Sequence, residues 1–511
     1  MTRLHRRHAG LCGACPLFAL LAAISGPTFA GAQIYQFDKV PFPDPRSLHT
    51  MYVFYVYSHQ EAPEKNAGHP FVKFHSLKAT AKPGVTVSGP ESAVQVSILP
   101  YADFWALIDP NRFCATELDV QAGRASHVNA LYLQKPSDKD QMSIFSDSVR
   151  FDDGGKDNQT PVRFTGVYIL VYSNCGDFVD ATVSGSIIVK NAYGFLPGNE
   201  YHKLPFYGWL SLVYVTMALV WMGLSLKWWR QLFHIQYCIA LVILLGLLEA
   251  FLFWIYYNDW NVSGSRSSFL FVIALFASVI KTIFSYMLVL VAALGWGVTR
   301  PYLDQRTILK LQAVAALYII IDFIRETVLS FRHSHSLSLM FVLLCLLPVA
   351  LLNGGIFYWI FMALSNLTET LRERRQQEKL ALFERLGKIL VGALGLASIT
   401  LLFQILDLSR SVNIRWHYQW LFSDGVSHLL YCLVLASMMF LWAPNMNSQR
   451  YVYSQQVDGD DKDEEKPATN VWAEDDREDD DGDDSFWATT HGQGTAVKPA
   501  LRAEKIGVSA D

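Results

Sequence analysis

The chain has 511 residues, of which 51% are hydrophobic and only 17% are charged, whereas a soluble domain has roughly 25% charged residues. Its net charge of −4 is unevenly distributed: residues 457–484 contain 15 acidic and 3 basic residues and carry −12, which leaves +8 on the rest. An acidic tail on a mildly basic, apolar body excludes a nucleic-acid-binding protein, which needs a basic face, and argues against an ordinary cytosolic enzyme.

We predict that residues 1–32 are a secretory signal peptide. Three arginines between positions 3 and 7 precede a short apolar core at 17–24, and Ala30-Gly31-Ala32 supplies a cleavage site that leaves Gln33 as the mature start. The alternative is a signal anchor that is retained, but the apolar stretch is too short to span a bilayer.

Residues 33–203 are predicted to form an all-β sandwich on the lumenal side. Short runs rich in β-branched and aromatic residues alternate with clusters of Gly, Pro, Asp and Ser, which is typical of strands and turns. These runs lie at 51–57, 85–87, 93–99, 162–172 and 181–189.

Cysteines and glycosylation sequons agree with an oxidising compartment. Cys114 and Cys175 are the two cysteines of this soluble part, and we expect a disulfide between them. Asn158 begins a sequon, although Pro161 directly after it lowers the odds of its use. A second sequon at Asn261 lies so close to the membrane that modification is not expected.

Residues 204–443 are predicted to form a bundle of seven transmembrane helices. Each apolar segment is near the length of about 20 residues that a bilayer requires. The segments are 204–226, 234–257, 269–298, 307–330, 337–364, 386–408 and 421–442.

The charges of the connections predict the orientation of the bundle. The first, third and fifth connections hold 11 Lys and Arg residues, and the second, fourth and sixth hold four. The positive-inside rule then places the odd connections in the cytosol and the β-sandwich in the lumen.

Residues 444–511 are predicted to be a disordered, acidic, cytosolic tail, because they show no hydrophobic periodicity and carry too much charge to fold alone. The alternative to a merely solvated tail is a segment that docks cytosolic trafficking machinery, with Tyr451 and Tyr453 close to the membrane.

Five ionisable residues fall inside the predicted helices, where a charge is costly unless it is paired or lines a cavity. Glu249 and Lys281 lie at similar depths on the second and third helices, and we expect them to pair. On the fourth helix, Asp322, Arg325 and Glu326 share one face through their i, i+3 and i+4 spacing. Two interpretations stay open, a polar cavity for a headgroup, ion or peptide and a salt-bridge network that only fixes helix packing.

No catalytic constellation is found. The last helix has no Lys for a retinal Schiff base, and only His428 lies well inside a helix, whereas a zinc site needs three or four ligands. We therefore expect no enzymatic activity, metal or cofactor, and a bound phospholipid is one candidate ligand.

The order of these parts resembles the lung seven-transmembrane receptor family, also described as Golgi-dynamics-domain (GOLD) seven-transmembrane proteins, and in particular its transmembrane protein 87 branch. The resemblance rests on HIQY at 234–237, LLGLLE at 244–249, SVIKT at 278–282, GWGVTRP at 295–301, FLWAP at 440–444 and NSQRY at 447–451.

The resemblance implies a lumenal Golgi-dynamics β-sandwich, a fold similar to that of the Wnt carrier Wntless, a lipid-filled cavity in the bundle, and residence in Golgi membranes with cycling to endosomes or the plasma membrane. Glu249 and Lys281 match family positions. Members can carry a further lumenal disulfide, for which this chain has no second pair of lumenal cysteines.

Three functions remain as hypotheses. The first is a non-enzymatic trafficking factor that binds lumenal cargo or a partner and engages cytosolic machinery through its tail. The second is an ion channel or lipid transporter that uses the charged residues. The third is a G-protein-coupled receptor, which is disfavoured because the third helix ends in Trp296-Gly297-Val298-Thr299-Arg300 without an acidic-Arg-aromatic motif, and the seventh helix lacks N-P-x-x-Y.

Overall fold

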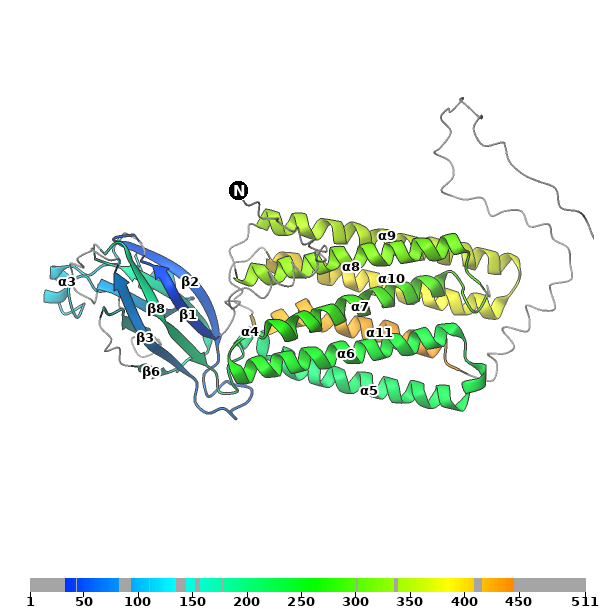
Figure 1. Ribbon diagram of the computed structural model, residues 1–511, viewed down its shortest axis with the longest axis horizontal. Helices are drawn as coiled ribbons and strands as arrows, with labels where there is room; N and C mark the ends of the chain where they lie inside the picture. The colour runs from blue at the N-terminus through cyan, green and yellow to red at the C-terminus, as the bar shows by residue number, and fades with distance from the viewer. Residues whose placement is uncertain are drawn as a thin grey trace, which may run out of the picture. The chain divides into compact units, whose positions relative to one another are not determined.

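The structure of the chain is a computed structural model that describes residues 33–42, 44–81, 93–109, 111–134, 144–151, 157–176, 178–299, 302–334, 339–408 and 416–444. The predicted signal peptide, the predicted strand at 85–87 and the acidic tail lie outside the described residues. Within them, an all-β region is followed by a bundle of apolar helices, which confirms the predicted fold class (Figure 1).

Two antiparallel four-stranded sheets form the β region, with strand orders β1-β8-β3-β6 and β2-β7-β4-β5. The strands are β1 (Ile34–Pro41), β2 (Ser47–Val56), β3 (Phe71–Ala81), β4 (Val94–Pro100), β5 (Phe145–Ser148), β6 (Asn158–Pro161), β7 (Gly166–Asn174) and β8 (Ala181–Lys190). Alternate side chains of both sheets point inward and form one core, which includes Phe54, Phe74 and Leu170.

A small insert connects β4 to β5. It contains α2 (Phe104–Leu107) and α3 (Glu117–Gln121) and packs Phe104 and Leu107 into a separate small core with Ile169 and Val171 of β7. The expected disulfide is present, because Cys114 of the insert is bonded to Cys175 at the end of β7. The insert is therefore fastened to the sandwich at two places.

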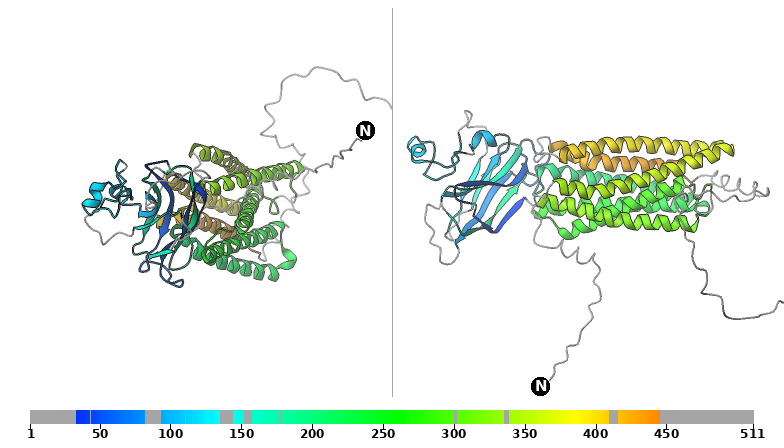
Figure 2. Two further views of the ribbon diagram at one scale, coloured as in Figure 1. Left: turned by 60° about the vertical axis from the view of Figure 1, so that its left-hand side comes forward. Right: turned by 90° about the horizontal axis from the view of Figure 1, so that it is seen from above.

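The bundle is built from six long apolar helices and one shorter helix (Figure 1). After the short α4 (Gly198–Tyr201) come α5 (Lys203–Lys227), α6 (His234–Ser263), α7 (Ser268–Ala293), α8 (Gln305–Ser334), α9 (Leu339–Glu373), α10 (Gln377–Leu408) and α11 (Val426–Leu441). Figure 2 shows the helices running alongside one another from two further directions. Seven helices were predicted at these places, and each is present.

Several helix ends differ from the prediction for identifiable reasons. Helix α7 ends at Ala293, five residues before the predicted end at 298, because Gly295 and Gly297 both have positive φ angles and turn the chain. Helices α9 and α10 instead extend past the predicted segments and form a hairpin joined by residues 374–376. The last predicted segment begins with a π-helical turn, η5 (Leu421–Gly425), before α11.

Candidate functional site

Glu249 of α6 and Lys281 of α7 form an ion pair in the interior of the bundle. The Lys281 Nζ lies 2.6 Å from Glu249 Oε2, and the two side chains are 5% and 0% exposed. The helices are joined by residues 264–267, so they are neighbours that run in opposite directions and bring the two residues to the same depth.

The Lys281 end of this pair is enclosed by polar and aromatic groups of α7 and α11. Its ammonium group lies 4.1 Å from the centre of the Tyr431 ring, a distance typical of a cation–π contact. Ser285, one turn after Lys281, donates its hydroxyl to the Lys281 carbonyl at 2.6 Å and also contacts the Tyr431 hydroxyl. The Lys281 ammonium therefore contacts both the Glu249 carboxylate and the Tyr431 ring.

On the other side of Glu249, His428 and Tyr207 continue the polar contacts toward the start of α5. His428 Nδ1 lies 4.0 Å from Glu249 Oε2, and His428 Nε2 lies 3.2 Å from the Tyr207 hydroxyl. That hydroxyl in turn donates to Asp424 Oδ1 at 3.5 Å. Asp424 belongs to the π-helical turn, a type of irregularity that is often found at functional sites.

Lys203, the first residue of α5, completes the series. Its Nζ lies 2.8 Å from Asp424 Oδ2 and 2.9 Å from Glu200 Oε2 of α4. We call the whole series the polar network; it consists of Glu200, Lys203, Tyr207, Glu249, Lys281, Asp424, His428 and Tyr431. It leads from the first turns of α5 and α11 into the middle of the bundle through direct contacts between neighbouring side chains.

The charged residues of α8 lie in a different place. Arg325 Nη2 is 2.8 Å from Asp322 Oδ1, the i, i+3 pair expected from the spacing, and the side chain of Asp322 is buried. The side chain of Glu326 lies outside the described part of the chain. The four predicted charges whose side chains the structure describes are thus divided between the polar network and an intrahelical pair.

Sequence reasoning missed part of the polar network. Glu200 and Lys203 fall in the predicted lumenal domain, and Asp424 falls at the start of the predicted seventh helix. The i, i+3 spacing of Glu200 and Lys203, directly before an apolar segment, was the available signal. Their convergence with Asp424 requires α5 and α11 to be adjacent, which no local pattern reveals.

The segment between β8 and α4 is fastened to the end of α6 by one residue, Asn261. Its side-chain Nδ2 donates to the Tyr193 carbonyl at 3.0 Å, and its side-chain Oδ1 accepts from the Leu196 amide at 3.1 Å. Its backbone carbonyl accepts from the Phe195 amide at 2.9 Å. We call these contacts the Asn261 clasp. The clasp thus involves the same side-chain nitrogen to which a glycan on this sequon would be attached.

A second contact links the sandwich to the segment that carries Asp424. Tyr57 directly follows β2, and its hydroxyl lies 3.2 Å from His202 Nε2. Its ring packs edge-on against Trp416, with 4.9 Å between the ring centres. Trp416 is buried in η4 (Trp416–Tyr418), five residues before the π-helical turn begins. The sandwich and the polar network are therefore joined through packed side chains.

The insert of the β region exposes two large apolar side chains. Trp105 of α2 is 72% exposed and Leu118 of α3 is 70% exposed. The buried Asp119 holds the turn between them: it accepts hydrogen bonds from the Thr116 amide and hydroxyl, and ion pairs with Arg112 at 2.7 Å and Arg124 at 3.1 Å. The hydrogen bonds from Thr116, supported by Arg112, lower the pKa of Asp119 to about 2.

Comparison with known proteins finds a family model that matches the bundle. Residues 202–449 match the family model "GOST, seven transmembrane domain". Transmembrane protein 87A of Xenopus tropicalis is 31% identical over 317 residues, 60% of this chain and 57% of that protein. Human transmembrane protein 87B is 27% identical over 301 residues, covering 58% and 53% of the two chains, and membrane protein PTM1 of Saccharomyces cerevisiae is 28% identical over 323 residues, covering 60% of each. The chain thus spans between one half and two thirds of these relatives.

Proposed function

We propose that this chain, whose residues 202–449 match the GOST seven-transmembrane domain and which is 31% identical to transmembrane protein 87A of Xenopus tropicalis over 317 residues, is a non-enzymatic trafficking factor of Golgi and endosomal membranes. The β-sandwich faces the lumen and binds a cargo or partner protein, and the acidic tail engages cytosolic trafficking machinery. The excess of Lys and Arg residues in the connections α5–α6, α7–α8 and α9–α10 together with the helix ends that flank them supports this orientation.

The observation that carries the proposal is the exposure of Trp105 and Leu118 on a fastened insert. Large apolar side chains, tryptophan above all, supply most of the binding energy in protein interfaces. A rigid support lowers the entropy lost on binding, and here the Cys114–Cys175 disulfide supplies it. The insert therefore has the features of a docking surface for a lumenal protein.

The contact of Tyr57 with Trp416 supports a role for the bundle in the same function. A partner on the sandwich changes the environment of a region that packs directly onto the segment before Asp424. Such packed contacts are the physical route by which binding on one domain alters another. The bundle is then the part that relays the lumenal state to the cytosolic side.

Proximity labelling in cells tests the docking surface. The variant with Trp105→Ser and Leu118→Ser is expected to lose lumenal neighbours that the wild-type protein labels, while its membrane abundance is unchanged. Val179→Ser is the matched control, because Val179 is also an exposed apolar residue of the β region but lies outside the insert. An identical set of labelled proteins for all three chains would contradict the proposal.

A second candidate, transport of an ion or of a lipid, is favoured by the polar network alone. A chain of ionisable groups in a membrane bundle is costly, and such chains commonly mark ion or proton paths. Flux through liposomes that contain purified protein tests this function with Glu249→Gln and Lys281→Met, and with Arg325→Gln outside the network as control. Absence of flux in the wild-type protein, or equal flux in every variant, would remove this candidate.

A further inference from the structure

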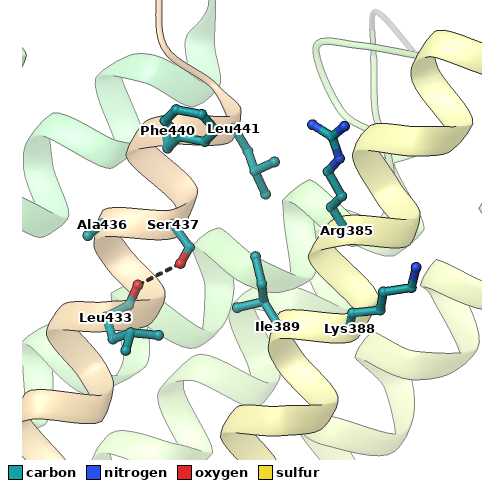
Figure 3. A pocket seen from close by; sticks show the side chains of 8 residues that line it. All are labelled: Arg385, Lys388, Ile389, Leu433, Ala436, Ser437, Phe440 and Leu441. Carbon is teal, nitrogen blue, oxygen red and sulfur yellow. Dashed lines mark hydrogen bonds between the residues drawn. The ribbon is translucent and has the colours of Figure 1, made fainter.

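A groove lies between α10 and α11, and its α11 lining runs from Leu433, two positions after Tyr431 of the polar network, to Leu441 at the end of the helix. It has a volume of about 550 Å³ and is lined by Arg385, Lys388 and Ile389 of α10 and by Leu433, Ala436, Ser437, Phe440 and Leu441 of α11 (Figure 3). A second groove of about 460 Å³ lies on the other side of α10, against α9, and shares Lys388. The first groove lies near the beginning of α10 and the end of α11, and the second lies near the beginning of α10 and the end of α9.

The wall of the α10–α11 groove is apolar and faces outward. Phe440 is 80% exposed and Leu433 is 60% exposed, one on each side of the small residues Ala436 and Ser437. The Ser437 hydroxyl donates back to the Leu433 carbonyl at 2.8 Å, so it presents no free donor to the groove. On a membrane-spanning helix, exposed apolar side chains of this kind contact lipid acyl chains.

Two cationic side chains, Arg385 and Lys388, lie at the mouth of this apolar groove. Arg385 and Lys388 are exposed and lie one turn apart on α10, the spacing that places two side chains on one face. In Figure 3, Arg385 extends beside Leu441, while Lys388 projects from the next turn on its flexible stem. The neighbouring carboxylate, Glu384, ion pairs with Arg372 at 3.2 Å.

The depth of these cations matches that of a lipid headgroup. They face the last turn of α11, which ends at Leu441, and the end of a membrane-spanning helix lies near the boundary between headgroups and acyl chains. Cations at this boundary, beside apolar side chains, are stabilised by an anionic phosphate, which accepts charge-assisted hydrogen bonds.

We propose that the α10–α11 groove is a binding site for an anionic phospholipid. The phosphate and the further negative group of the headgroup bind Arg385 and Lys388, and one acyl chain lies along Ile389, Leu433 and Ala436. The proposal does not depend on the proposed function, because it concerns neither the insert nor the polar network. The basic connections put this site in the cytosolic leaflet, where anionic lipids are concentrated.

Lipid retention by the purified full-length protein in nanodiscs tests the site. In mixtures of phosphatidylserine and phosphatidylcholine, native mass spectrometry is expected to show preferential retention of phosphatidylserine. Arg385→Gln and Lys388→Gln are each expected to weaken retention by roughly fivefold, and Arg306→Gln with Lys310→Gln at the start of α8, also in a predicted cytosolic connection, is the control. Equal retention of both lipids by the wild-type protein, or equal loss in the control, would overturn the proposal.

A second variant tests the acyl wall without altering charge. Ala436→Trp fills the groove and is expected to reduce phosphatidylserine retention while the midpoint of thermal unfolding in pure phosphatidylcholine nanodiscs stays unchanged. Soluble glycerophosphoserine distinguishes a lipid from a free phosphate ligand, because it lacks acyl chains and should compete only weakly. Full competition by the soluble compound, or undiminished retention by a folded Ala436→Trp protein, would contradict a lipid site.

Discussion

Asp119 is the residue on which the polar contacts of the insert converge. Because its folded-state pKa of about 2 lies below the ordinary value of 3.8, the ionised carboxylate stabilises the folded state at neutral pH. That contribution is fully present above about pH 4 and is lost as the pH falls through about 2. The insert that exposes Trp105 and Leu118 is thus held in place by a carboxylate whose contribution is lost only in strong acid.

The variant Asp119→Asn tests this assignment. It is expected to unfold at a lower temperature than the wild-type protein at pH 7, because the neutral amide cannot pair with Arg112 and Arg124 as a charge, and the difference should shrink toward pH 2. Thermal unfolding from pH 7 to pH 2 measures it, with the exposed Glu117→Gln as control. A difference that is constant over this range would show that ionisation of Asp119 does not contribute.

The two lumenal sequons lead to opposite predictions. Asn158 is exposed on β6, an edge strand, so Asn158→Gln should remove any glycan detected as an endoglycosidase-sensitive shift in electrophoretic mobility. Asn261→Gln should leave that shift intact but lower stability by about 1 kcal/mol for each hydrogen bond lost from the Asn261 clasp. A glycan attached to Asn261 would contradict the structural role of this side chain.

The Glu249–Lys281 pair gives a third prediction at this scale. Removing one partner leaves a buried charge, so Glu249→Gln or Lys281→Met alone should destabilise the protein by about 3–5 kcal/mol. The double variant has no unpaired charge and should regain much of that loss. Thermal unfolding of the four chains forms a double-mutant cycle, and additive losses would show that the two residues are not coupled.

At the scale of the element, the segment between β8 and α4 depends on one glycine. Gly194 has a φ of +146°, and a Cβ atom there would lie 2.6 Å from the Asn261 backbone carbonyl oxygen. Gly194→Ala is therefore expected to displace the Asn261 clasp and lower the free energy of unfolding by about 1–3 kcal/mol. Gly223→Ala in α5 is the control, because nothing lies within 4 Å of its Cβ position.

For Gly223→Ala we expect no loss of stability, because alanine is favoured over glycine inside a helix by about 1 kcal/mol. Its unfolding temperature should be unchanged or raised. If Gly194→Ala behaved in the same way, the segment between β8 and α4 would not be fixed by its contact with α6.

Elements differed in how well the sequence predicted them. All seven helices were predicted, since a bilayer requires long apolar segments, and the depth of Glu249 and Lys281 followed from adjacent helices. Strands β1, β3, β5 and β6 were not predicted. A register shift between His75 and Lys78, with Ser76 at positive φ, interrupts the alternation of β3. Lys203 and Asp424 are 221 positions apart, and only the packed bundle brings them together.

At the scale of the whole molecule, different features occupy the two ends of the bundle. The outer part of the polar network, with Lys203 and Asp424, and the Asn261 clasp lie where α5, α7 and α11 begin, and the basic hairpin α9–α10 and the α10–α11 groove lie where α9 and α11 end. This separation agrees with a protein that binds a partner on one side of the membrane and meets anionic lipids on the other. The uneven distribution of charged residues along the sequence is the simplest sign of this difference between the two ends.

The most direct test of the account is transport in cells that lack this protein. Quantitative imaging and surface proteomics should show that a subset of Golgi cargo is retained, and that the wild-type chain and Val179→Ser restore its delivery. The chain with both Trp105→Ser and Leu118→Ser should reach the same membranes without restoring delivery. Normal delivery of every surveyed cargo in the deficient cells, or full rescue by the double variant, would contradict a trafficking function that depends on the insert.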